Sequence, residues 1–143
     1  MKTTLVVPTE LFREIESAAH VSVETAGVLI ATYVITPTGD IRLLAQSIFW
    51  VDESSYLKRT RHELVIASSG FVPALAEAEK RGAVCLWFHT HPGLDGMPLP
   101  SLRDDQVDRD VADVFRVRTN SDLYGTLIVS PREKAIAFSG TLQ

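Results

Sequence analysis

The sequence predicts an α/β (α+β) fold, a mixed β-sheet with helices packed on it. Three observations favour this class. Short apolar runs of strand length outnumber amphipathic helical segments, the two kinds of segment are interspersed along the chain, and the turn signal Pro-Thr-Gly-Asp at residues 37–40 joins two runs into a hairpin. The length of 143 residues, with 45% apolar and 22% charged residues, suits a single domain, residues 1–143, with one sizeable core.

The first half of the chain predicts strands around one helix. Residues 5–8 form a short strand, after which Thr9 caps a helix that runs to about residue 19. Its apolar residues share one helix face, at the spacing i, i+4 and i+7: Leu11, Ile15 and Ala18. Residues 25–35 are apolar on both alternating faces, so we expect a central strand covered on both sides, paired as a hairpin with residues 41–49.

The second half also mixes strands and helices. In chain order we expect a polar loop or ragged helix at 51–61, a strand at 63–67, a helix at 71–81, a strand at 83–89, a loop at 92–100, a helix from Ser101, and strands at 124–129 and 134–138 joined by a turn at 130–133. The helix that starts at Ser101 carries a predicted buried stripe of Val107, Val111 and Val114.

Bulk properties argue against several classes of protein. A formal net charge of -4 gives no overall basic field, so nucleic acid is not an expected partner. No apolar run approaches the ~18 residues that a membrane span needs, and the N-terminus lacks a signal-peptide layout. Cys85 is the single cysteine, which rules out an internal disulfide and fits a reducing cytoplasm. We expect this thiol to be a small buried strand residue and not a reactive group.

The segment Trp-Phe-His-Thr-His-Pro at residues 87–92 carries the strongest chemical signal. Residues two apart on a strand point the same way, roughly 6.5–7 Å apart, so His89 and His91 can converge on one metal ion. Pro92 cannot continue the ladder, which places the pair at a strand end where a cleft can open. A histidine pair alone is weak evidence, because surface and core histidines also occur at this spacing.

Asp104 is the candidate for a third ligand. It stands in Ser101-Leu-Arg-Asp104, which follows the glycine- and proline-rich loop and opens a helix. The same pattern is that of a helix capping box, in which Ser101 and Asp104 satisfy backbone groups. The two interpretations are compatible, and three ligands would leave a fourth tetrahedral position open for water, as in catalytic zinc sites. A base is then needed, and Glu24 before the central strand is the candidate; a solvated carboxylate is the plainer interpretation of that residue.

Together these segments resemble the JAMM (MPN-plus) family of zinc isopeptidases in its minimal prokaryotic form. The resemblance covers nearly the whole chain, and its motifs are Glu24-x-x-Gly27-x-Leu29, His89-Thr90-His91-Pro92 and Ser101-x-x-Asp104. It implies a curved mixed sheet flanked by helices, akin to the cytidine deaminase scaffold. It also implies Zn²⁺ held by His89, His91 and Asp104, with Glu24 as general base and Ser101 stabilising the tetrahedral intermediate.

One departure from the family concerns the third ligand. Twelve residues separate His91 from Asp104, more than is usual in the family, so Asp95 and Asp105 are rival ligands. A basic cluster of Lys58, Arg59, Arg61 and His62 could receive an acidic modifier surface, although a solvated loop explains it more simply. His20 and His62 lie outside any ligand spacing, and we expect both to be structural or surface residues.

The function implied by the resemblance is hydrolysis of the amide after the C-terminal glycine of a ubiquitin-like modifier, in deconjugation or precursor processing. The implied partners are a ubiquitin-like protein or its conjugates, with E1- or E2-like enzymes encoded beside it. Two alternatives stay open: a zinc peptidase acting on sulfur-carrier proteins or small peptides, and a non-catalytic MPN scaffold. A zinc nucleobase deaminase is disfavoured, because the sequence has no Pro-Cys-x-x-Cys ligand pair.

Overall fold

The structure is a computed structural model that describes residues 1–93, 98–133 and 135–143. In chain order the elements are β1 (Thr3–Val6), α1 (Thr9–Ala19), β2 (Ala26–Ile35), β3 (Ile41–Trp50), β4 (Tyr56–Arg59), β5 (Leu64–Ile66), α2 (Val72–Arg81), β6 (Val84–Thr90), α3 (Leu102–Thr119), β7 (Gly125–Arg132) and β8 (Ala135–Leu142). Two short 3₁₀ turns, Glu53–Ser55 and Ser68–Gly70, flank the β4–β5 hairpin. Within this described part of the chain, no helix combines the length and the apolar character needed to cross a membrane.

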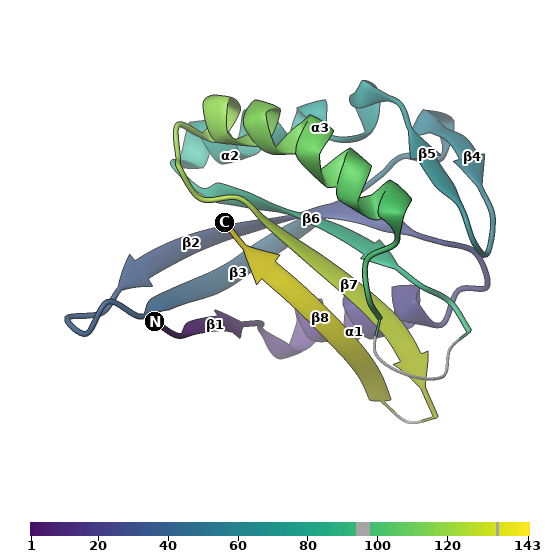
Figure 1. Cartoon of the computed structure of the whole chain (residues 1–143), viewed down its shortest axis with the longest axis horizontal. Helices are drawn as coiled ribbons and strands as arrows, with labels where there is room; N and C mark the ends of the chain where they lie inside the picture. The colour runs from purple at the N-terminus through teal and green to yellow at the C-terminus, as the bar shows by residue number, and fades with distance from the viewer. Residues whose placement is uncertain (94–97, 134) are drawn as a thin grey trace.

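Six strands form one mixed sheet in the order β1-β3-β2-β6-β7-β8, and β4 pairs with β5 in a separate hairpin. β1 runs parallel to β3 and β6 parallel to β7, whereas the β2–β3, β2–β6 and β7–β8 pairs are antiparallel. The sheet is curved, with α1 on one face and α2 and α3 on the other (Figure 1). The predicted mixed sheet flanked by helices is therefore confirmed, as is the hairpin of residues 25–35 with residues 41–49.

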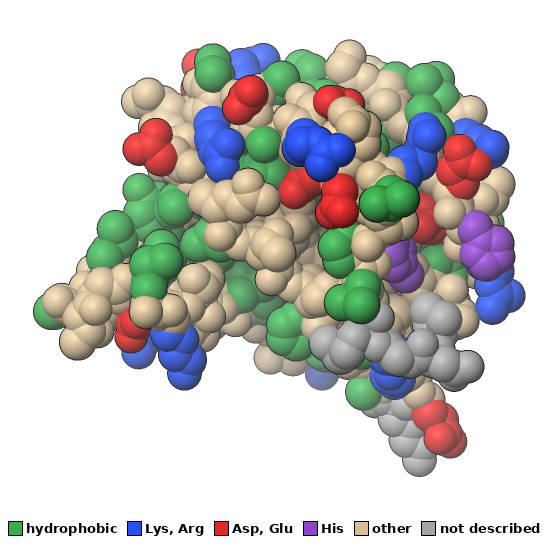
Figure 2. Space-filling model, viewed as in Figure 1, with side chains coloured by type: hydrophobic (Ala, Val, Ile, Leu, Met, Phe, Trp, Pro, Cys, Tyr) green, Lys and Arg blue, Asp and Glu red, His purple; other side chains and the backbone are tan. Residues whose placement is uncertain are grey.

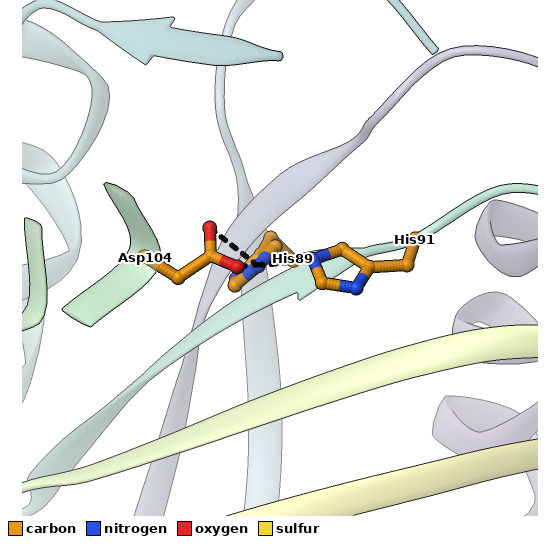
Figure 3. A group of neighbouring side chains, drawn as sticks. All are labelled: His89, His91 and Asp104. Atoms are coloured by element: carbon orange, nitrogen blue, oxygen red, sulfur yellow. Dashed lines mark hydrogen bonds and ion pairs between the residues drawn. The ribbon is translucent and has the colours of Figure 1, made fainter. Parts of the chain in front are cut away.

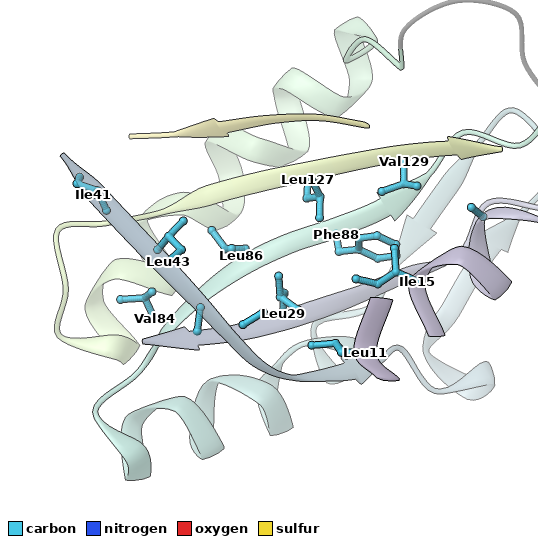
Figure 4. Packing of buried hydrophobic residues seen from close by; sticks show 13 residues of the cluster. Leu11, Ile15, Leu29, Ile41, Leu43, Val84, Leu86, Phe88, Leu127 and Val129 are labelled. Carbon is cyan, nitrogen blue, oxygen red and sulfur yellow. The ribbon is translucent and has the colours of Figure 1, made fainter. Parts of the chain in front are cut away.

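Apolar side chains close the face of the sheet that α1 covers. Leu11 and Ile15 of α1 pack against alternate residues of the strands, among them Leu29 and Phe88 (Figure 4). Trp50 meets Phe88 edge to face, with ring centroids 5.5 Å apart. Burying each such side chain stabilises the fold by ~1.5–3 kcal/mol, so this face is an apolar core.

The opposite face holds a second core under α2 and α3. Val28 and Ile30 of β2 and Trp87 of β6 pack there against Leu75 and Phe115 of the two helices. Successive strand residues point to opposite faces, so along β6 the side chains alternate between the two cores. His89, two residues after Trp87, therefore faces α3 and not α1.

Two predicted details of the first half are wrong. Thr9 is the first residue of α1 and not its cap, because Pro8 is extended and its carbonyl oxygen accepts the first helical bond from Phe12 N–H at 2.9 Å. β2 is covered on both sides only as far as Ala31. Beyond it, Val34 and Ile35 are 50% and 63% exposed, because the end of the β2–β3 hairpin extends past the helices (Figure 1).

The polar stretch at residues 51–61, predicted as a loop or ragged helix, contains a strand. Its 3₁₀ turn leads into β4, which pairs with β5, the strand predicted at 63–67. Tertiary contacts hold β4: the hydroxyl of Tyr56 accepts a hydrogen bond from Ala26 N–H at 3.0 Å, and Arg59 stacks on the Tyr56 ring at 4.4 Å. Such contacts leave no periodic signal in the sequence.

Two expectations about the C-terminal third are also wrong. β7 continues through the predicted turn at 130–133 as far as Arg132, and β8 extends to Leu142. Pro131 is tolerated because β6 ends at Thr90, beside Val129, so that Pro131 has a strand neighbour on one side only. Lys134, where the last strand was predicted to begin, lies outside the described residues. On α3 the predicted stripe is rotated: Val107 and Val111 are half-buried and Val114 is exposed, while Ala112, Phe115 and Thr119 are buried.

Candidate metal centre

The end of β6 brings two histidine side chains together. His89 is the second-last residue of the strand and is 3% exposed. His91 follows the strand, and its backbone N–H donates to the Val129 carbonyl at 2.8 Å, which keeps the chain extended past Thr90. The two imidazoles thus point the same way, with their Nε2 atoms 3.2 Å apart. The convergence expected from the spacing is present.

Asp104 approaches this pair from the first turn of α3. Its Oδ1 atom lies 3.3 Å from Nε2 of His89, and its Oδ2 atom lies 3.1 Å from Nε2 of His91 (Figure 3). Within residues 1–93, 98–133 and 135–143, these three side chains are the group whose ligand atoms converge for a metal, all within 4.8 Å of one another. Asp105 does not join them, and Asp95 lies outside the described residues.

The capping box predicted at this point is also present. Asp104 N–H donates to Ser101 Oγ at 3.1 Å, and Ser101 N–H donates to Asp104 Oδ2 at 2.7 Å. The structural and the metal-binding interpretations of Ser101-x-x-Asp104 therefore hold together, because the capping bonds orient the carboxylate towards the histidines. Burial acts to raise the pKa of Asp104, but hydrogen bonds from His89, His91 and Ser101 outweigh it and hold that pKa well below its usual range. The ionised form is the one that binds a cation.

The donor set fits a zinc ion. Ligands about 2.0–2.1 Å from a tetrahedral zinc lie roughly 3.3 Å from one another. The closest atoms of each pair of residues lie 3.1, 3.2 and 3.3 Å apart, with Asp104 meeting His91 through Oδ2 and His89 through Oδ1. With one ligand atom taken from each residue, all three atoms lie within 4.8 Å of one another. Two imidazoles and one carboxylate are ligands that zinc accepts, and three protein ligands leave a position open for water or substrate.

Glu24 lies beside the triad and is buried, with 6% of its surface exposed. Its Oε1 atom is 3.9 Å from Nε2 of His91. Burial raises the pKa of Glu24 to about 7, while the nearby His91 acts in the opposite sense. The plainer interpretation of this residue, a solvated carboxylate before a strand, is therefore wrong.

Two residues to which the sequence analysis gave no such role, Thr90 and Arg59, hold Glu24 near the histidines. Thr90, between the two histidines, accepts a hydrogen bond from Thr25 N–H on its hydroxyl at 2.9 Å and donates its own N–H to the Thr25 carbonyl at 2.9 Å. Arg59 donates from Nε to the Glu24 carbonyl at 2.8 Å and from a terminal nitrogen to the Thr25 hydroxyl at 2.8 Å. The position of Thr90 inside the His-x-His motif was the available signal; nothing local pointed to Arg59.

Cavities open on both sides of Glu24 and Ser101. One, of about 140 Å³, lies between α3 and β5 and has apolar walls that include Leu64, Phe71 and Val111. The other, of about 240 Å³, shares Glu24, His62 and Ser101 with the first and is otherwise lined by Arg61, His91, Pro92 and Gly93. Figure 2 shows a histidine side chain recessed in a hollow near the N-terminal end of α3. Both cavities therefore border residues beside the triad.

The predicted basic cluster is divided by its contacts. Lys58 pairs with Glu63 at 2.6 Å and Arg59 pairs with Glu53 at 3.0 Å. The guanidinium of Arg61 packs against Gly93, which has a φ of +77° and where a Cβ atom would collide with it. Arg61 and His62 thus border the cavity of about 240 Å³ beside the triad, whereas Lys58 and Arg59 are engaged elsewhere.

Three other expectations are confirmed. Cys85 is buried on β6, and burial raises the pKa of its thiol to about 12, so the group is not a reactive thiolate. His20 and His62 are exposed. The Nδ1 atom of His20 lies 2.8 Å from the Glu16 carbonyl, a local contact of α1.

Comparisons with known proteins do not assign the chain to a family. No protein-family model matches the sequence, and no curated protein matches it either. Among solved structures, the N-terminal domain of STIL from Trichoplax adhaerens is similar, with a TM-score of 0.45 and 8% identity over 98% of this chain. The match spans 41% of that STIL chain. A likeness this weak identifies neither a fold family nor a function.

Proposed function

We propose that this chain is a zinc-dependent isopeptidase or peptidase of the JAMM (MPN-plus) type, which hydrolyses the amide after the C-terminal glycine of a ubiquitin-like modifier. The convergence of His89, His91 and Asp104 to within 3.1–3.3 Å, with the buried Glu24 3.9 Å from His91, carries the proposal. A curved mixed sheet flanked by helices is compatible with the MPN scaffold.

The reaction divides between the metal and the chain's own residues. A zinc ion held by His89, His91 and Asp104 would polarise the carbonyl and lower the pKa of water towards ~7. Glu24 takes one proton from the attacking water as the oxygen bonds to the amide carbon, and returns it to the leaving amine as the C–N bond breaks. The hydroxyl of Ser101 donates to the carbonyl oxygen while negative charge develops there. The products are a carboxylic acid and an amine, so the atoms of one water are consumed.

The cavities suggest how such a substrate would lie. The cavity of about 140 Å³ beside β5 suits an extended tail, which can add to a strand edge. We place the glycine tail of the modifier there, with the scissile amide between Glu24 and Ser101. The partners would then be a ubiquitin-like protein or its conjugates, with E1- or E2-like enzymes of the same operon, in the cytoplasm.

A second candidate function is favoured by Arg61. Its guanidinium lines the same cavity as Glu24, His91 and Ser101, where a leaving amine would lie. A cation there suits an amine that carries a free carboxylate, such as an amino acid released from a sulfur-carrier protein or a small peptide. Comparing fluorogenic substrates whose leaving amine carries a carboxylate or its amide separates the two candidates.

The test of the proposed function joins metal content to turnover. Purified protein should contain close to one zinc per chain by elemental analysis and should hydrolyse a ubiquitin-fold protein joined through its C-terminal glycine to a fluorescent amine. Glu24→Gln should keep the zinc and lose ~10²–10⁴-fold in rate. Glu10→Gln, at an exposed glutamate of α1, is the matched control. Bound zinc without turnover on any such substrate would favour the non-catalytic scaffold.

A further inference from the structure

A third cavity lies behind His89. It has a volume of about 120 Å³ and is bounded by Trp87, His89 and the acidic side of α3, with hydroxyl-bearing residues of β7 and β8 on its other wall: Thr126, Ser139 and Thr141. Glu24, His91 and Ser101 do not line it. It is therefore distinct from the cavities in which we place the reaction.

The His89 ring leaves one nitrogen without a partner. Its Nε2 atom faces Asp104 and His91, whereas Nδ1 is buried and has no hydrogen-bond partner among the described residues. A neutral histidine that binds a metal through Nε2 carries its proton on Nδ1, and this N–H usually donates to an outer acceptor. A buried N–H without an acceptor is destabilising, because it has lost its hydrogen bond to water. An acceptor is thus expected within the cavity.

Asp108 is the best acceptor that the cavity offers. It lies one helical turn after Asp104, so both carboxylates face the sheet. The hydroxyls on the opposite wall are neutral and therefore weaker acceptors than a carboxylate; Thr126 and Thr141 bond each other at 2.8 Å, and Ser139 donates to the Pro98 carbonyl. Asp105 also borders the cavity but is exposed.

Tyr124 holds the Asp108 carboxylate in place. The Tyr124 hydroxyl donates to Oδ1 of Asp108 at 2.5 Å. Tyr124 is 1% exposed, and its ring packs edge-on against Phe115 with centroids 5.4 Å apart. Burial raises the pKa of Asp108, and the Tyr124 hydrogen bond and the neighbouring His89 oppose that rise. The carboxylate is thus held by a buried tyrosine on a wall of the cavity that His89 also lines.

We propose that Asp108 is a positioning residue for the metal centre: it accepts the Nδ1 proton of His89 through a water in this cavity and so keeps the Nε2 lone pair directed at the metal. A water needs only ~10–15 Å³ of accessible volume and two to four polar partners, and the cavity meets both conditions. The inference rests on the metal site of the proposed function but not on hydrolysis.

Zinc affinity tests this role without any substrate. In competition with a chromophoric chelator, Asp108→Ala should bind zinc ~10–100-fold more weakly than the wild type. Asp108→Asn keeps an acceptor oxygen and should recover part of the loss, and Tyr124→Phe should lose less than Asp108→Ala. Asp105→Ala, which removes the same charge from the same helix, is the control and should bind zinc as the wild type does.

Imidazole nitrogen NMR gives an independent readout. Zinc-loaded wild type should show His89 protonated at Nδ1, and Asp108→Ala should broaden or shift that signal. Unchanged zinc affinity and an unchanged His89 signal in Asp108→Ala would overturn this inference and leave the proposed function standing. A wild-type chain that binds no zinc would overturn both the inference and the proposed function. Equal losses of zinc affinity in Asp105→Ala and Asp108→Ala would also overturn the inference, because the loss would then reflect the removed negative charge and not a hydrogen bond to His89.

Discussion

The two faces of the sheet are built from the same strands but differ in kind. Under α1, Leu11, Ile15 and Phe88 close an apolar core. Under α2 and α3, the core gives way near the end of β6 to buried polar groups, among them Glu24 and His89, and to cavities. The first face is stabilised mainly by apolar burial, whereas the second also buries polar groups, which need hydrogen-bond partners.

Strand β6 shows how a single segment serves both faces. Phe88 points into the core under α1 and its neighbour His89 points at α3, because side chains alternate along a strand. Phe88 therefore serves stability and His89 serves the proposed metal site. A substitution at Phe88 should change the free energy of unfolding, and one at His89 should change zinc affinity.

The largest effect is expected from Phe88→Ala. It should lower the free energy of unfolding by ~3–5 kcal/mol, because it leaves a hole in the apolar core. Urea denaturation followed by circular dichroism measures this, with Val117→Ala as control, since Val117 is 78% exposed. The zinc content per folded chain should stay unchanged. If Phe88→Ala lost as much zinc as His89→Ala does, the two faces of the sheet would not have separate roles.

Next in size is the effect of the ligands on zinc affinity. Asp104→Ala should weaken binding by more than the ~100-fold that a supporting residue can cost, equivalent to more than ~2.8 kcal/mol. Asp105→Ala should leave the affinity unchanged, because its carboxylate does not join the converging group. Competition with a chelator measures the zinc affinity of both variants. If the order is reversed, Asp105 is the ligand and our assignment is wrong.

A smaller effect, taken over one pH unit, is expected at alkaline pH on the face that carries the site. The pKa of Cys85 is about 12 in the folded chain, above the ordinary value of 9.0. Between pH 9.0 and about 12 the folded chain keeps the thiol proton while the unfolded chain loses it. The contribution of the Cys85 thiol to the free energy of unfolding is therefore full below pH 9.0 and is lost as the pH rises towards 12. The slope should be about 1.4 kcal/mol per pH unit. Cys85→Ala should flatten the stability curve between these limits, and an unaltered slope would contradict the assignment.

The smallest effect concerns the helix start at the metal centre. Ser101→Ala should lower the free energy of unfolding by ~1 kcal/mol, because Asp104 N–H loses its capping acceptor. Ser101→Thr keeps a capping hydroxyl and should restore most of this stability. Thermal unfolding of both variants provides the comparison. Equal stability of Ser101→Ala and wild type would mean that the capping box contributes nothing measurable.

Elements with strong periodicity were predictable, and those that depend on distant contacts were not. The hairpin of residues 25–35 with 41–49 and the buried position of Cys85 follow from local pattern. Strand β4 could not be predicted, because Tyr56 and Arg59 find their partners at Ala26, Glu24 and Thr25. Pro131 misled the prediction, because tolerance for proline depends on which strand ends beside it.

The sequence by itself determined the residue types at the site: two histidines at strand spacing, a capping-box aspartate and a glutamate before a strand. Local geometry sufficed for these, since strand alternation and helix capping act within a few residues. Only the tertiary structure decided that Glu24 is buried beside His91 and that Asp104 and not Asp105 joins the histidines. It also decided that Asp108, which Tyr124 hydrogen-bonds, lines a cavity together with His89. These features depend on how α3 packs across β6 and β7, and residues far apart in sequence meet there.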